Sequence, residues 1–188
     1  MNLNYFQEIL MAESANHGTV RSQYIDEPGQ KTIEAYDKLG TDGKLAFLYY
    51  VYEKMGDSIT PAAPAAAEPE LAPVLLGNFY KLSHDDQLNV MRDIVNGADS
   101  EYSRGYGALK ENNQLVVWYA WAQAMGESVV GMPEGHSASE AIAGVLGQVE
   151  KLDFDQQISL LREIAGTMGY TDVQEIPTQA QTGKTSSL

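Results

Sequence analysis

Hydrophobic residues recur at helical spacing along most of the chain. In the stretch 41–55 they follow the i, i+3, i+4, i+7 rule, which places them on one face of a helix. The residues on this face are Leu45, Leu48, Tyr49, Tyr52 and Met55. Comparable patterns predict helices over 68–81, 85–95, 111–125, 137–151 and 155–167. The sequence therefore predicts an all-α fold.

The helical pattern occurs twice in the chain, at an offset of seventy residues. "LGTDGKLAFLYYVYEKMGDSI" from Leu39 matches "LKENNQLVVWYAWAQAMGESV" from Leu109, and "LSHDDQLNVMRDI" from Leu82 matches "LDFDQQISLLREI" from Leu152. Without a gap, residues 40–94 and 110–164 are identical at 14 of 55 positions. We interpret the chain as a duplicated three-helix unit, because internal repeats of this length are structural units that pack on one another.

Several residues predict where the helices begin and end. Ser83 and Asp153 have the side chains of N-caps, and each has a polar residue three positions on. Gly56 and Gly126 stand where the first helix of each copy is expected to stop. Outside the repeat, we expect residues 1–30 to form an N-terminal arm and 171–188 a flexible C-terminal tail, around one helical domain over 31–170.

Composition narrows the class of protein. The 188 residues include 26 acidic and 12 basic side chains, a formal net charge of −14, which repels nucleic acid and anionic membranes. The longest uncharged aromatic run, 112–126, is too short and too polar to span a bilayer. Cysteine is absent, which agrees with a reducing compartment and excludes disulfides and thiolate ligands. We expect a soluble protein with neither nucleic acid nor membrane as partner.

The sequence offers little catalytic chemistry. His17, His84 and His136 lie far apart and lack the spacing of a zinc site. "GYGALK" from Gly105 resembles the start of a phosphate-binding loop, but the later glycines and the preceding strand are missing. We therefore predict no metal and no enzyme activity.

Aromatic side chains are concentrated on the first helix of each copy. They are Phe47, Tyr49, Tyr50 and Tyr52 in one helix and Trp118, Tyr119 and Trp121 in the other. Such residues at helical spacing usually pack in a core, but they surround these helices more fully than one buried face requires. Together with the adaptable methionines Met91 and Met125, they also suit a long, flat, apolar ligand. Both interpretations stay open at this point.

The stretches "LAFLYYVYEKMGDSIT", "QLNVMRDIVNGAD", "RGYGALKENNQLVVWY" and "QQISLLREIAGTMGY" carry a family resemblance. Over residues 39–170 the chain resembles the N-terminal domain of the cyanobacterial orange carotenoid protein. Larger members of that family append a mixed α/β domain, which this sequence does not contain, so the resemblance implies a stand-alone helical carotenoid protein. It also implies two interleaved four-helix bundles around a tunnel that holds one keto-carotenoid, namely canthaxanthin, echinenone or 3'-hydroxyechinenone.

Matching the family by position implies ten carotenoid-binding residues. They are Leu45, Tyr49, Tyr52, Met91, Leu115, Trp118, Met125, Met132, Pro133 and His136. Two of them depart from the family, since Tyr49 stands where a tryptophan is usual and His136 where a tyrosine is usual. These departures lie at positions expected to surround a terminal ring of the pigment.

The resemblance implies photoprotection, by quenching singlet oxygen, phycobilisome excitation energy or both, with carotenoid transport as a further role. Arg162 matches an antenna-contacting arginine, although its repeat mate Arg92 suggests a shared structural purpose instead. Asn112 matches a contact to the appended domain and is expected here to cap a helix. Implied partners are the phycobilisome or a separate carotenoid-carrying homologue of the C-terminal domain. The implied location is cytoplasmic, at the phycobilisome on the thylakoid surface. The alternative is a pigment-free helical interaction module.

Overall fold

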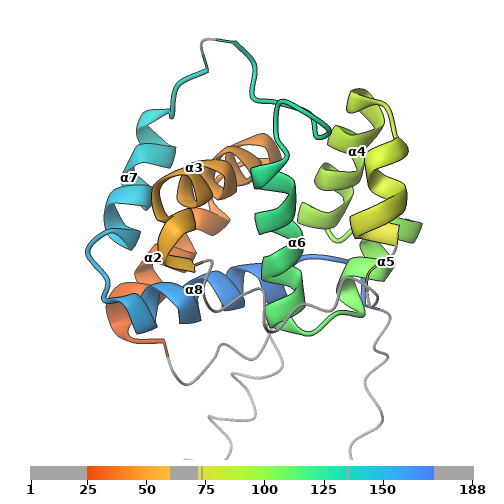
Figure 1. Cartoon of the computed structure of the whole chain (residues 1–188). Coiled ribbons are helices and arrows are strands. Elements are labelled where there is room, and N and C mark those ends of the chain that lie inside the picture. Colours follow the sequence, from red (N-terminus) through yellow and green to blue (C-terminus); the bar gives the residue numbers. More distant parts are fainter. Residues whose placement is uncertain (1–24, 60–71, 73, 135, 172–188) are drawn as a thin grey trace, which may run out of the picture.

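The computed structural model describes residues 25–59, 72, 74–134 and 136–171, and these residues are largely helical (Figure 1). The α-helices are α2 (Glu27–Asp37), α3 (Thr41–Ile59), α4 (His84–Val95), α5 (Glu101–Gly107), α6 (Glu111–Gln123), α7 (Glu140–Val149) and α8 (Phe154–Gly166). A π-helix, η3 (Val74–Asn78), and a 3-10 helix, η4 (Phe79–Lys81), precede α4. The described part contains no strand beyond one isolated bridge. The all-α prediction is confirmed.

Helix α2 begins earlier than the expected end of the N-terminal arm. The Asp26 side chain accepts a hydrogen bond from the backbone of Gly29 at 2.8 Å, and Pro28 lies in the first turn, where its missing N–H costs nothing. Ile33 and Tyr36 are buried. The boundary expected after residue 30 therefore falls inside a helix that belongs to the folded body. Residues 1–24 of the arm and 172–188 of the tail lie outside the described residues.

The helix starts reproduce the seventy-residue offset. Helices α3 and α6 begin at residues 41 and 111, and α4 and α8 at 84 and 154. The predicted N-caps are confirmed, because Ser83 Oγ accepts from the third residue of α4 at 3.2 Å and Asp153 Oδ1 from that of α8 at 2.9 Å. The offset also relates two buried tyrosines, Tyr36 in α2 and Tyr106 in α5. The repeated unit thus contains one helix more than the three predicted.

Two predicted helix boundaries are wrong. Helix α3 continues through Gly56 to Ile59, whereas α6 ends before Gly126, whose φ of 82° favours glycine. The predicted helix over 68–81 lies partly in residues outside the description, and its described end, 74–81, forms the π and 3-10 turns instead of an α-helix. Within this segment the carbonyl of Leu75 accepts a hydrogen bond from the indole of Trp121, which links the backbone of the segment to α6.

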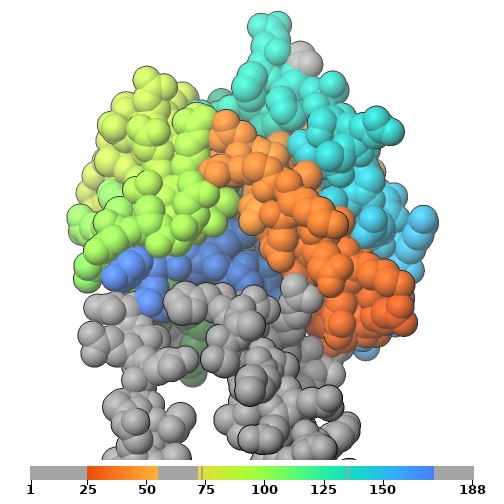
Figure 2. All heavy atoms as spheres, turned by 180° about the vertical axis from the view of Figure 1, so that it is seen from behind, coloured from red at the N-terminus to blue at the C-terminus, as the bar shows by residue number. Residues whose placement is uncertain are grey.

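The additional helix at the start of each copy, α2 or α5, packs against helices of the other copy. Helix α2 contacts α7 and α8, and its counterpart α5 contacts η3 and α4. Helix α3 contacts α4 and α7, its counterpart α6 contacts α8 and η3, and α3 and α6 contact each other. From behind, the α2–α3 segment lies between the residues of α4–α5 and those of α7 (Figure 2). One buried cluster draws side chains from all of these elements.

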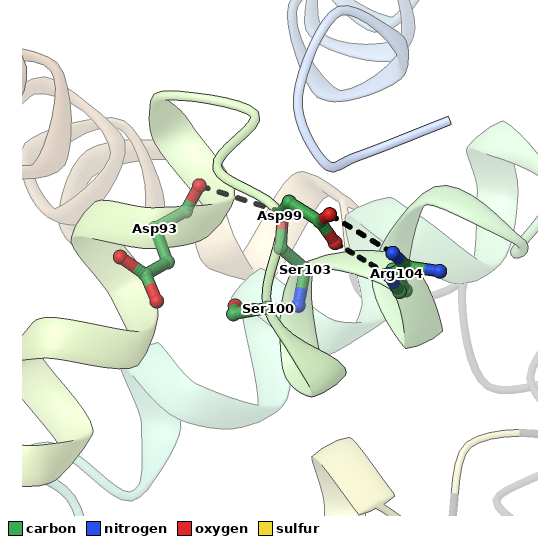
Figure 3. Close-up of polar contacts among 5 residues, drawn as sticks. All are labelled: Asp93, Asp99, Ser100, Ser103 and Arg104. Atoms are coloured by element: carbon green, nitrogen blue, oxygen red, sulfur yellow. Dashed lines mark hydrogen bonds and ion pairs between the residues drawn. The ribbon is translucent and has the colours of Figure 1, made fainter. Parts of the chain in front are cut away.

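Polar contacts fix the turn between α4 and α5 (Figure 3). Ser100 caps α5 by accepting from the backbone of Ser103 at 3.4 Å, and the Ser103 hydroxyl donates to the carbonyl of Asp93, also at 3.4 Å. Arg104 forms a two-pronged ion pair with Asp99. The turn therefore has a defined conformation although it is largely polar.

The chain after α8 returns to this turn. Gly169 donates its N–H to the carbonyl of Ile94 at 2.8 Å, and Tyr170 donates to the carbonyl of Ser103 at 3.1 Å. Gly169 has a φ of 83°, and a Cβ on it would lie 2.7 Å from the ring of Tyr106 and 2.8 Å from the backbone nitrogen of Gly107. Only glycine fits this close approach without displacement.

Candidate functional site

A cavity of about 430 Å³ opens between α3, α4, α6 and the segment that follows α6. Nine of the ten residues implied by the family resemblance line it: Leu45, Tyr49, Tyr52, Met91, Trp118, Met125, Met132, Pro133 and His136. The other lining residues are Asp42, Ala46, Leu48, Leu88, Arg92, Trp121, Ala122, Val130 and Gly131. Residues dispersed over almost a hundred positions are thus brought to one largely apolar space.

The tenth residue, Leu115, is absent from the cavity wall. It is buried in α6, and its carbonyl accepts a hydrogen bond from the Tyr52 hydroxyl at 2.8 Å. Its repeat mate Leu45 does line the cavity. The cavity lies beside the first half of α3 and the second half of α6, so it occupies one side of the repeat and is not symmetric.

Three side chains of the aromatic wall, Tyr52, Trp118 and Trp121, hydrogen-bond their polar groups to other parts of the protein. Trp118 Nε1 donates to the Tyr106 hydroxyl at 2.8 Å, and that hydroxyl donates to the carbonyl of Ala165 at 3.0 Å. Trp121 Nε1 donates to the carbonyl of Leu75 at 3.1 Å. Burial raises the pKa of the Tyr52 and Tyr106 hydroxyls, which keeps both protonated as donors. These side chains therefore present apolar ring surface to the cavity.

The aromatic rings also pack on one another. Trp121 stacks on Phe79 with a centroid distance of 4.0 Å, and Trp118 meets Trp121 edge-on at 5.3 Å. Trp118 and Tyr52 are 4% and 7% exposed, yet both line the cavity. The same rings are therefore core on one side and cavity wall on the other, an arrangement compatible with both interpretations of the aromatic stripes.

A charged pair stands at the edge of the cavity. Arg92 Nε and Nη2 donate to the two carboxylate oxygens of Asp42 at 2.8 and 3.0 Å. The hydrogen bond from Arg92 lowers the pKa of the Asp42 carboxyl, against a smaller opposing effect of burial. Both side chains remain partly exposed to solvent.

The segment after α6 is held over the cavity by two polar side chains. Gln87 of α4 is buried, accepts from the backbone of Val130 at 2.8 Å and donates to the carbonyl of Ser128 at 2.9 Å. The Tyr50 hydroxyl lies 2.8 Å from His136 Nδ1, and the two rings stack at 6.0 Å. Sequence reasoning missed Gln87. The repeated glutamine pair, Gln87 and Gln157, was the available signal, since an uncharged polar residue kept in both copies indicates a backbone contact.

Two residues proposed from the family lie elsewhere. Arg162 is exposed on α8 and forms no ion pair within the described part of the chain, unlike its repeat mate Arg92. The two arginines therefore differ in their ion pairing. Asn112 is the second residue of α6, after an N-cap position occupied by Lys110, so its prediction as the helix cap is wrong.

Among the described residues, no group of three or more His, Asp or Glu side chains could hold a metal ion. None of the helices in the same residues is long and apolar enough to cross a bilayer.

Comparison with known proteins gives consistent matches. Residues 22–171 match the family described as the orange carotenoid protein, N-terminal. An orange carotenoid-binding domain-containing protein of Nostoc sp. is 41% identical over 139 residues, which cover 73% of this chain and 81% of that protein. The orange carotenoid-binding protein of Synechocystis sp. is 32% identical over 141 residues, which cover 74% of this chain but 44% of that longer protein.

Solved structures with the same fold include two from Anabaena (Nostoc) sp. PCC 7120. The Red Carotenoid Protein binding canthaxanthin superposes with a TM-score of 0.67 at 30% identity, covering 76% of this chain and 99% of that one. The Orange Carotenoid Protein binding canthaxanthin gives a TM-score of 0.71 at 25% identity, covering 92% of this chain and 53% of that one. Both proteins are similar to this chain in fold and sequence.

Proposed function

This chain belongs to the orange carotenoid protein N-terminal family, and from that membership we propose that it binds one keto-carotenoid in the cavity between α3, α4 and α6. The observation that carries the proposal is the convergence of nine family-matched residues on one apolar space. Tyr52, Trp118 and Trp121 have their polar groups turned to protein partners, which leaves flat ring surface for a polyene.

We propose that the cavity is one end of a longer tunnel between two interleaved four-helix bundles. An extended carotenoid is about as long as a 20-residue helix, ~30 Å, so it would reach past the contact of α3 with α6 into the other half. The exchanged packing of α2 and α5 supports the interleaving, because each copy's first helix completes the other copy's group. Tyr119 and Leu115 stand at the positions equivalent to Tyr49 and Leu45 and would face that second half.

The proposed role is photoprotective and not catalytic. A bound polyene would accept excitation from singlet oxygen or from the phycobilisome and release it as heat, while the protein fixes its geometry and keeps it dispersed in water. Arg162, exposed on α8, would be available to an antenna or to a carotenoid-carrying partner. The proposed location is accordingly the cytoplasm, beside the thylakoid surface.

The test is the absorption spectrum of the protein produced in a host that makes keto-carotenoids. We expect a coloured protein with one pigment per chain, quantified by extraction against protein concentration. A colourless, folded protein from such a host would instead favour the pigment-free interaction module. Singlet-oxygen quenching and phycobilisome fluorescence quenching, measured separately on the coloured protein, would then distinguish the two photoprotective roles.

A further inference from the structure

Arg92 and Asp42 form the only ion pair among the residues that line the described cavity. We propose that Arg92, oriented by Asp42, donates a hydrogen bond to an oxygen atom on the terminal ring of the bound pigment. It thereby favours keto- or hydroxy-bearing rings over hydrocarbon rings and decides which end of an unsymmetrical pigment enters. This inference rests on the proposed function and names a specificity-determining residue within the same site.

The rest of the wall has little to offer an oxygen atom. The indole N–H groups of Trp118 and Trp121 are hydrogen-bonded to Tyr106 and Leu75, and the Tyr52 hydroxyl donates to Leu115. A ring oxygen placed among these groups would lose its hydrogen bonds to water without replacement, which is costly. A hydrocarbon ring would lose nothing there.

Arg92 has N–H donors that its bonds to Asp42 do not engage. A guanidinium carries five N–H groups in a planar fork. The two bonds to Asp42 engage Nε and Nη2, and neither engages Nη1. Two bonds along one edge of the fork fix the plane of the guanidinium and thus the direction of its remaining N–H groups, so a bond to the pigment would cost little further side-chain entropy.

Two other polar side chains at the cavity are weaker candidates. The Tyr50 hydroxyl occupies His136 Nδ1 at 2.8 Å. Tyr49 carries a hydroxyl, but a neutral phenol forms a weaker hydrogen bond than a charged guanidinium. Tyr49→Phe therefore serves as a comparison variant and is expected to change pigment preference much less than a change at Arg92.

The repeat provides a matched control. Asn112 stands in the second copy where Asp42 stands in the first, and Arg162 stands where Arg92 stands. Arg162 is exposed and does not line the cavity. The same substitution at the two arginines removes the same charge and keeps an apolar stem of similar length, but only one change touches the cavity.

The experiment loads the wild-type chain, Arg92→Met and Arg162→Met with an equimolar mixture of canthaxanthin and β-carotene. Retained pigments are extracted and their ratio is measured by chromatography. A charge-assisted hydrogen bond predicts a preference for canthaxanthin of about tenfold or more in the wild type. Arg92→Met should bring the ratio close to one, whereas Arg162→Met should keep the wild-type ratio. Circular dichroism confirms that the variants are folded.

Resonance Raman spectra of the canthaxanthin-loaded proteins supply a second readout. In the wild type, one of the two ring carbonyls should show a C=O band lowered by hydrogen bonding, and this band should return to the frequency of the other in Arg92→Met. A wild-type protein without a lowered band, or an Arg162→Met variant that changes as Arg92→Met does, overturns the inference. Equal retention of both pigments by the wild type overturns it but leaves the proposed function standing. Retention of neither overturns both.

Discussion

Tyr36 and Tyr106 are equivalent residues of the repeat, but their hydroxyls differ in hydrogen bonding. The Tyr106 hydroxyl joins Trp118 to Ala165, whereas the buried Tyr36 hydroxyl has no partner among the described residues. Tyr106→Phe should lower the free energy of unfolding by about 1–3 kcal/mol, because it leaves the Trp118 N–H buried and unpaired. Tyr36→Phe should be neutral or stabilising. Urea unfolding of the two variants tests this, and equal losses would contradict it.

The ion pair of Asp42 with Arg92 predicts a dependence of stability on pH. Arg92 lowers the pKa of the Asp42 carboxyl in the folded state, so the pair stabilises the protein above the unfolded pKa of about 3.9 and ceases to do so as pH falls through the lower folded value. Because both side chains are partly exposed, water screens the pair and its contribution to stability should be small. Asp42→Asn should thus be less stable than the wild type at pH 7 and equally stable near pH 2. A stability difference that persists in acid would argue against the pair.

The family resemblance was sufficient to predict nine of the eighteen residues of the cavity wall. Among the predicted residues Leu115 was the exception, because the repeat makes Leu45 and Leu115 equivalent whereas the cavity lies to one side of the repeat. Gln87 bonds to the backbone of a segment about forty residues away, so a pattern of neighbouring residues cannot predict its role. Residue types and spacing predict which side chains share a helix face, but not where packing leaves space.

At the scale of elements, the backbone of α5 and the chain that follows α8 approach each other closely at Gly107 and Gly169. Gly169→Ala should lower the free energy of unfolding by about 2–4 kcal/mol, because it combines a left-handed conformation with steric overlap against Tyr106 and Gly107. Gly144→Ala is the control, since Gly144 lies within α7 with open space at its Cβ and alanine is the better helix former by about 0.5–1 kcal/mol. Thermal denaturation should shift in opposite directions, and a Gly169→Ala variant as stable as the control would refute the argument.

Sequence reasoning missed or misplaced elements whose presence and ends depend on contacts that form only in three dimensions. Helix α5 has seven residues, too few to show a periodic apolar face, and its polar cap and turn contacts become visible only in three dimensions. Helices α3 and α6 place glycine at equivalent positions but only α6 ends there. The turn after α6 has its own hydrogen bonds, from Gly126 N–H to the Val129 carbonyl and from Val129 N–H to the Ala124 carbonyl. A glycine permits a helix to stop, and its surroundings decide whether it does.

At the scale of the whole molecule, the duplication explains both the fold and the site. The cavity takes α3 and α4 from the first copy and α6 with its following segment from the second. Neither copy alone contains the full wall, just as the helices that pack against α2 or α5 belong to the opposite copy. Sequence divergence between equivalent residues, such as Asp42 and Asn112, then allows one half to carry a polar edge that the other lacks.

This exchange predicts how the chain behaves when it is divided. Fragments 1–98 and 99–188 separate the copies in the turn before α5, and each then exposes apolar surface that the other normally buries. We expect each fragment alone to lack cooperative unfolding and a defined near-ultraviolet circular dichroism spectrum. An equimolar mixture should recover both, together with pigment binding if the cavity is the pigment site. Since the copies are related by sequence, size-exclusion chromatography must show that the recovered species contains one of each fragment. Cooperative unfolding of either fragment as a monomer would show that the exchanged packing is not required for folding.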